Sequence, residues 1–172
     1  MLNREPYADL PELPTFTLTS EDIKDGDQAP DWMLSKAMGI EKGEDTNPQL
    51  SWSGFPEETK SFVITCYDPD APTPSGFWHW TASNIPADIT SVARGAADEL
   101  KAVKHTNDGG TDSFMGFAPP EGHGAHRYIF CVTAVDTEEL DIDASASPAV
   151  VNFNLFFHGI ARAFLTVTHE EK

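Results

Sequence analysis

Basic side chains are scarce in this 172-residue sequence, which has 11 Lys and Arg against 28 Asp and Glu and a formal net charge of −17. Proteins that hold nucleic acid through its phosphates need a basic face, because Lys and Arg displace the condensed counterions. The same negative charge opposes tight association with anionic bilayers. The composition therefore excludes general nucleic-acid binding and argues against an anionic membrane surface as the partner.

Long hydrophobic runs and cysteines are also scarce. No stretch of about 18 apolar residues occurs, and residues 1–6 lack the apolar core of a signal peptide, so we expect a cytoplasmic protein without stable membrane insertion. The two cysteines, Cys66 and Cys131, lie inside apolar runs. This favours two buried thiols, with a disulfide between neighbouring strands as the alternative.

Common catalytic and nucleotide-binding motifs are missing. The run SWSG at residues 51–54 does not match G-x-S-x-G, and neither GxGxxG nor GxxxxGK[ST] occurs. A thiol nucleophile is disfavoured, because apolar surroundings raise the pKa of a thiol. The sequence thus gives no support to a hydrolase elbow, a nucleotide loop or a cysteine nucleophile.

Hydrophobic residues make up 40% of the chain and aromatic residues 10%, which together with the length indicates one globular domain. Residues 1–13 combine acids and prolines without apolar periodicity, so we expect a flexible arm before a domain over residues 14–172. Strand-like runs follow at 15–19, 49–52, 61–67, 77–85, 100–106 and 126–135. The last is rich in β-branched and aromatic residues and is predicted to be a central strand buried on both faces.

The chain changes period after Ser147–Pro148, where a capping hydroxyl precedes a proline suited to a first helical turn. Apolar residues then recur at spacings of three and four, at positions 150, 153, 157, 160, 164 and 167. This predicts one amphipathic helix covering the end of a mainly β domain. A short apolar patch at residues 32–38, or a sheet edge, offers a route to a homodimer.

Three polar clusters lie at the ends of predicted strands, where rigid scaffolds place binding residues. They are Asp68-Pro69-Asp70-Ala71-Pro72, Trp78-His79-Trp80, and the loop from Ala118 to Tyr128, which contains Pro120 and His126. Strand alternation predicts that His79 faces away from the two indoles, and that His126 and Tyr128 share one face. Taken singly, each cluster is explained as well by a proline turn, a core histidine or an ordinary loop.

Together the three clusters could frame one pocket. Two histidines facing Asp68 and Asp70 should have raised imidazole pKa values, because an opposite charge favours the protonated form. Imidazolium groups, the Tyr128 hydroxyl and backbone N–H groups would make a small anion site. The same residues could ligate a divalent metal, but no tight repeat such as H-x-x-x-H is present, so we expect neither metal nor cofactor.

The order of these motifs resembles the phosphatidylethanolamine-binding protein family, also called Raf kinase inhibitor proteins. The motifs on which this resemblance rests are DPDAP at 68–72, WH at 78–79 with Asn84 five residues after the histidine, PPEG at 119–122 and HRY at 126–128. The chain is most similar to the bacterial YbhB/YbcL branch, which shares NPQLSW at 47–52 and FNLFFH at 153–158. The resemblance extends from about Phe16 to Thr168.

The resemblance implies a Greek-key, antiparallel β-sandwich with short peripheral helices and a shallow anion pocket between loops at one end. It implies that the pocket is formed by Asp68, Asp70, His79, Pro120, His126 and Tyr128. Phe117 and Ala118 add bulk where the family usually has glycine or proline. Family members bind phosphate-like and phospholipid head groups, and some inhibit kinases or serine proteases.

We therefore expect a non-catalytic module that binds a small anion or phosphorylated group and can regulate a protein partner such as a kinase or protease. Two alternatives stay open. One is a hydrolase with Asp68 or Asp70 as general base and His126 as general acid. The other is a serine-protease inhibitor that presents the acidic arm or another exposed loop. An anion would bind against the net charge of −17, so added salt should improve its binding.

Overall fold

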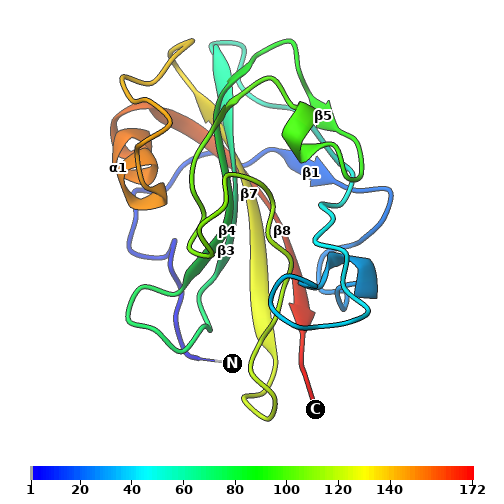
Figure 1. Cartoon of the computed structure of the whole chain (residues 1–172). Coiled ribbons are helices and arrows are strands. Elements are labelled where there is room, and N and C mark those ends of the chain that lie inside the picture. Colours follow the sequence, from blue (N-terminus) through cyan, green and yellow to red (C-terminus); the bar gives the residue numbers. More distant parts are fainter. Residues whose placement is uncertain (1) are drawn as a thin grey trace.

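In the computed structural model, which describes residues 2–172, the chain forms two antiparallel β-sheets packed face to face (Figure 1). The smaller sheet has the order β1 (Thr17–Thr19), β2 (Leu50–Ser53), β5 (Ser91–Val92). The larger has the order β6 (Val103–Lys104), β4 (Phe77–Pro86), β3 (Ser61–Asp68), β7 (His126–Val135), β8 (Gly159–His169). Two short 3-10 helices, η1 (Asp31–Met33) and η2 (Ala97–Glu99), and one α-helix complete the fold. The predicted mainly β sandwich is confirmed.

Strand alternation in β7 explains how the core forms. Phe130, Val132 and Ala134 point into the core between the sheets, while Val135 packs in a second cluster on the opposite face. β7 lies between β3 and β8 and is buried along nearly all of its length, as the sequence predicted. Cys66 and Cys131 are buried free thiols.

The helix α1 (Pro148–His158) is shorter than the sequence predicted. The Ser147 hydroxyl caps it by accepting the Val150 N–H at 3.2 Å, and Val151 and Leu155 pack onto the second cluster. The prediction that the helix continues to Val167 is wrong, because residues 159–169 form β8 and pair with β7 along its length. There Ala161, Ala163, Leu165 and Val167 alternate into the core, and this pairing outweighs the three–four spacing.

The segment predicted as an exposed apolar patch, residues 32–38, is largely part of the core. Met33 and Leu34 are fully buried, because the backbone of this segment pairs with Phe117: Ser35 N–H donates to Phe117 O at 2.8 Å and Phe117 N–H to Met33 O at 3.1 Å. Met38 remains exposed. The patch therefore offers little apolar surface to a second copy.

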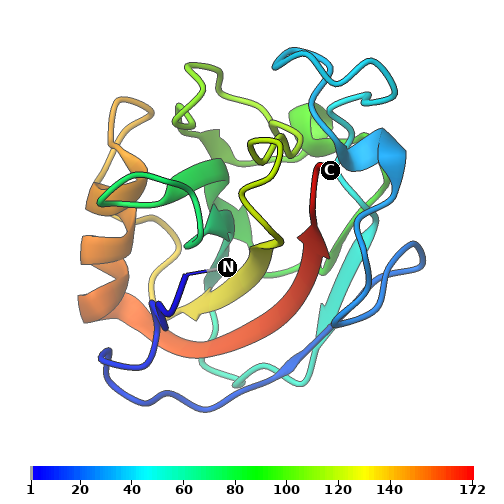
Figure 2. The ribbon, with the colours of Figure 1, turned by 90° about the horizontal axis from the view of Figure 1, so that it is seen from below.

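Residues 2–13, predicted as a flexible arm, run along the outer face of the larger sheet (Figure 2). Tyr7 meets Phe164 of β8 edge to face, with 4.8 Å between the ring centroids. Flexibility of the arm stays a prediction, and Met1 lies outside the described residues. Within residues 2–172, no helix is both long and apolar enough to span a membrane.

Candidate functional site

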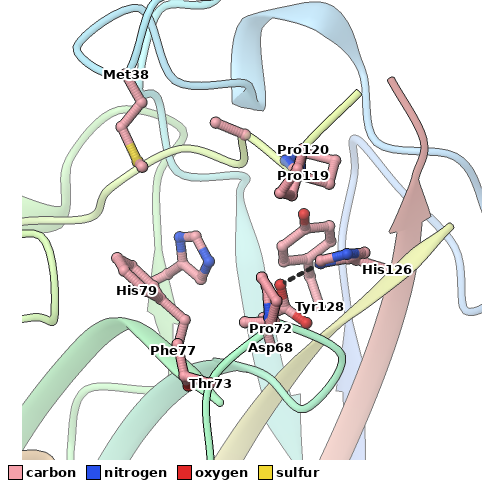
Figure 3. A pocket seen from close by; sticks show the side chains of 12 residues that line it. Met38, Asp68, Pro72, Thr73, Phe77, His79, Pro119, Pro120, His126 and Tyr128 are labelled. Carbon is pink, nitrogen blue, oxygen red and sulfur yellow. Dashed lines mark hydrogen bonds and ion pairs between the residues drawn. The ribbon is translucent and has the colours of Figure 1, made fainter. Parts of the chain in front are cut away.

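A cavity of about 230 Å³ opens at one end of the larger sheet (Figure 3). Because β3 is antiparallel to β4 and β7, its last residue, Asp68, lies beside the first residues of both neighbours, with Phe77 as its partner on β4. Loops 69–76 and 115–125 and the exposed Met38 close the sides. The lining residues are Met38, Asp68, Ala71, Pro72, Thr73, Phe77, His79, Ala118, Pro119, Pro120, His126 and Tyr128.

Five of the six residues named from the sequence line this cavity, and Asp70 does not. The Asp70 carboxylate is buried and accepts hydrogen bonds from Arg127 Nε at 2.9 Å, Arg127 N–H at 2.8 Å and Leu2 N–H at 2.6 Å. Burial alone would raise the pKa of Asp70, but its bonds to Arg127 lower it overall. Asp70 therefore anchors Arg127 and the N-terminal arm behind the cavity.

Asp68 is oriented by protein donors on both of its oxygens. Its Oδ2 accepts from Nδ1 of His126 at 2.7 Å, and its Oδ1 accepts from the Asp70 N–H at 2.7 Å. Burial raises the pKa of Asp68, and the hydrogen bond from His126 opposes that shift. The carboxylate thus gives the cavity a fixed, partly compensated negative charge.

A third histidine, His123, which the sequence did not single out, continues this chain of hydrogen bonds to the surface. His123 Nδ1 lies 2.7 Å from His126 Nε2. His123 is exposed and stands between Gly122 and Gly124, both in the left-handed region with φ of 73° and 89°. Both nitrogens of His126 are therefore engaged within the protein. The signal that could have found His123 is the glycine-flanked histidine three residues before the HRY motif.

His79 is neutral, contrary to the sequence-based expectation. Its Nδ1–H donates to the Met115 carbonyl at 3.0 Å, and it packs against Phe77, Phe117 and Tyr128. Burial lowers the pKa of His79 to about 4. Since Nδ1 carries the proton, Nε2 is a hydrogen-bond acceptor. His79 therefore contributes an acceptor and no positive charge.

The predicted alternation of His79 against both indoles is also wrong. The β3–β4 register shifts between Cys66/Trp80 and Tyr67/Trp78, a β-bulge that leaves His79 without a partner on β3. Trp80 and His79 consequently both reach the inner core, where Trp80 lies near Phe114 and His79 near Phe117. The bulge is what turns the imidazole into the cavity.

Tyr128 lines the cavity, and its hydroxyl is buried and has no hydrogen-bond partner among residues 2–172. Phe117 stacks on its ring at 3.7 Å and fills the core rather than the cavity. Burial raises the pKa of Tyr128, so the hydroxyl stays protonated. Figure 3 shows its oxygen pointing toward Pro119 and Pro120.

The cavity therefore has mainly apolar walls and a few polar groups. Tyr128 offers a donor, His79 an acceptor and Asp68 a carboxylate. Burial raises the pKa of Cys66 and raises that of Cys131 to about 11, so neither thiol is an activated nucleophile. In residues 2–172, no three His, Cys, Asp or Glu side chains are grouped to hold a metal ion.

Comparisons with protein families, with known sequences and with solved structures all point to the same family. Residues 19–170 match the family described as phosphatidylethanolamine-binding protein. The chain is 45% identical to YbhB of Escherichia coli (strain K12) over 154 residues, which cover 87% of this chain and 96% of YbhB. The crystal structure of E. coli YbcL matches with a TM-score of 0.86 and 44% identity, covering 91% of this chain and 99% of that one.

A more distant likeness concerns the fold alone. The carboxypeptidase Y inhibitor, solved in complex with its cognate proteinase, matches with a TM-score of 0.52 and 17% identity over 92% of this chain and 85% of that one. The family match covers most of the chain, and the relatives are similar over nearly their whole length. The chain therefore belongs to the phosphatidylethanolamine-binding protein family.

Proposed function

We propose that this chain is a non-catalytic binding protein whose cavity holds a phosphate-type anion that also carries a hydrogen-bond donor. The observation that carries the proposal concerns Tyr128: the residue lines the cavity, and its hydroxyl is buried without a partner in residues 2–172. Leaving such a donor unsatisfied costs about 1–3 kcal/mol. A phosphate oxygen that accepts from Tyr128 would remove that cost.

The other polar groups define the charge of the ligand. Nε2 of the neutral His79 is an acceptor, and the Asp68 carboxylate is negative, so both disfavour a fully dianionic phosphate. A singly charged phosphate with a P–OH group, or a phosphate linked to an ammonium group, presents both an acceptor for Tyr128 and a donor for His79. This chemistry fits a phosphoethanolamine head group.

The size of the cavity supports a head group rather than a whole lipid. Its volume of about 230 Å³ is below the roughly 300–1,000 Å³ typical of sites for drug-sized ligands. Ala71, Pro72, Pro119 and Pro120 supply apolar contacts for the carbon atoms next to the phosphate. Thr73 and Met38 are exposed, so the attached lipid or protein can remain outside.

Two sources could supply this group: a phospholipid head group, or, below its second pKa of about 6, the singly charged phosphate of a phosphorylated side chain on a regulated protein such as a kinase. Isothermal titration with O-phosphoethanolamine, glycerophosphoethanolamine and inorganic phosphate separates them. Binding of both ethanolamine compounds would favour a lipid head group, whereas a requirement for the monoester would favour a phosphorylated side chain. Failure of all three to bind between pH 5 and pH 8 would refute the proposal.

Hydrolysis is a second candidate because Asp68, His126 and His123 form a continuous hydrogen-bonded chain. Two features place it second. Both nitrogens of His126 bind protein atoms, and the lowered pKa of His79 makes that imidazole a weak base at neutral pH. Release of alcohol or phosphate from ester and phosphoester substrates, lost in His126→Gln, would establish hydrolysis in place of simple binding.

A further inference from the structure

A second cavity, of about 410 Å³, lies on the other side of the larger sheet. Its walls come from four parts of the chain: the N-terminal arm at Tyr7 and Leu10, the helix α1 at Phe153 and Phe156, β8 at Arg162, and β7 at Thr133. Arg162 points here because its neighbours Ala161 and Ala163 point into the core. This cavity shares no lining residue with the first one.

The walls of the second cavity are unusually apolar for an exposed region. Phe153 is 66% exposed and Phe156 is 57% exposed, although both are large aromatic side chains. The helix that carries them has no Lys, Arg, Asp or Glu over residues 148–158. An apolar body placed against these rings would remove them from water and gain about 25 cal/mol for each Å² buried.

Arg162 gives this apolar cavity one positive charge. Its Nη1–H donates to the Pro11 carbonyl at 3.2 Å, and its guanidinium lies 5.8 Å from the centroid of the Tyr7 ring. Within residues 2–172 it has no carboxylate partner, whereas Arg94 pairs with Asp22 and Arg127 with Asp70. A guanidinium that has only a carbonyl and a ring beside it can still form charge-assisted hydrogen bonds with an anion.

We propose that the second cavity binds a small amphipathic anion, an aromatic or acyl body that carries one carboxylate or sulfonate group. The anionic group pairs with Arg162, and the apolar body lies against Leu10, Phe153 and Phe156. A second copy of this chain fits less well, because each copy carries a net charge of −17. An anionic bilayer meets the same repulsion, whereas the proposed ligand brings only one negative charge and pairs it with Arg162.

The test uses the full-length chain and the aromatic sulfonate 8-anilinonaphthalene-1-sulfonate, followed by its fluorescence and by calorimetry. We expect one probe to bind per chain. Arg162→Gln should weaken binding about tenfold, as expected for loss of one charge-assisted bond. Arg162→Lys should retain most of the affinity, and the uncharged analogue N-phenyl-1-naphthylamine should bind more weakly than the sulfonate.

Two phenylalanines on the same helix provide a matched pair of variants. Phe153→Ser should weaken probe binding more than Phe157→Ser, because Phe157 is 63% exposed, does not line the cavity and only supports the Phe153 and Phe156 rings edge to face. Equal affinity of wild type and Arg162→Gln, or equal loss in both phenylalanine variants, would overturn the proposal. So would a wild-type dimer in sedimentation that Phe153→Ser dissociates, since the face would then be an interface between copies.

The same experiment separates this site from the first cavity. Saturating O-phosphoethanolamine and the variant Tyr128→Phe should leave the probe's affinity unchanged, because neither touches the second cavity. Displacement of the probe by O-phosphoethanolamine would assign it to the first cavity and overturn the second site. Failure of O-phosphoethanolamine to bind would count against the proposed function alone.

Discussion

His126 donates its Nδ1–H to Oδ2 of Asp68 over 2.7 Å, and both side chains are buried almost completely. The bond joins the end of β3 to the start of β7, two strands that are neighbours in the larger sheet. It fixes the orientation of the imidazole ring. The pair therefore links β3 to β7 beside the cavity, and both of its side chains line the cavity.

Asp68→Asn tests this tie. Asp68 now accepts hydrogen bonds from two donors, His126 Nδ1–H and Asp70 N–H. The amide of Asn would place its NH₂ group against one of these donors, and that hydrogen bond would be lost. We expect the free energy of unfolding to fall by about 2 kcal/mol. Urea unfolding measures this change, with the exposed Asp88→Asn as control. An equal, small effect of both variants would show that the tie contributes little.

The neutral state of His79 predicts how stability depends on pH. Its folded-state pKa of about 4 lies below the ordinary value of a histidine, so the unfolded chain takes up the proton more readily. This contribution to stability is fully present above about pH 6.5 and is lost as the pH falls toward 4, on the order of 3 kcal/mol in all. His79→Gln should show a shallower loss of stability between these pH values in urea titrations.

Parallel pH dependence of wild type and His79→Gln would contradict the neutral, buried assignment of His79. Asp70 and Asp22 do not interfere in this window. The pKa values of both are lowered, so their contributions are lost only below the ordinary range of an aspartate.

Arg127 holds the N-terminal arm, so Arg127→Lys should release it. The guanidinium binds Asp70 through Nε and Nη2 and also donates to the carbonyls of Leu2 and Arg4 at 3.1 and 2.8 Å. An ammonium group cannot reproduce this fork. We expect a loss of about 1–2 kcal/mol, reduced by solvent screening, and faster amide exchange in residues 2–8. Arg94→Lys, in a more exposed pair, is the control, and unchanged exchange in the arm would refute this role for Arg127.

Much of the fold could be predicted from the sequence, because its signals are local. The run at 126–135 is apolar on both faces, and it forms the buried β7. The end of the helix could not be predicted, because the apolar residues between 160 and 167 fit a helical spacing as well as a strand. Pairing with β7, which is distant in sequence, makes these residues a strand and not a helix.

Part of the lining of the candidate site could be predicted, and its chemistry could not. The order of the motifs pointed to Asp68, His79, His126 and Tyr128, and all four line the cavity. The bulge that turns His79 inward, and the burial that lowers its pKa, depend on the register with β3. In the sequence Asp70 looked equivalent to Asp68, but its carboxylate pairs with Arg127 and does not line the cavity.

Ionic strength should strengthen ligand binding at the first cavity, as the charge of the sequence suggested. A phosphate-type anion approaches a chain with a net charge of −17 and meets a cavity that contains the Asp68 carboxylate. Raising salt from about 0.01 M to about 0.15 M shortens the Debye length from roughly 30 to 8 Å and weakens the long-range repulsion. Calorimetry with O-phosphoethanolamine should show higher affinity at the higher salt concentration. Weaker binding there would mean that local positive charge dominates the approach.

The central claim is that the partnerless Tyr128 hydroxyl donates to the ligand, and Tyr128→Phe tests it most directly. The substitution removes one oxygen atom and no hydrogen bond of the free protein, so thermal stability should be unchanged or higher. Tyr7→Phe is the matched control, because the Tyr7 hydroxyl is likewise buried without a hydrogen-bond partner in residues 2–172 and Tyr7 does not line this cavity. Calorimetry with O-phosphoethanolamine should show about tenfold weaker binding for Tyr128→Phe and wild-type affinity for Tyr7→Phe. Wild-type affinity in Tyr128→Phe would contradict the account.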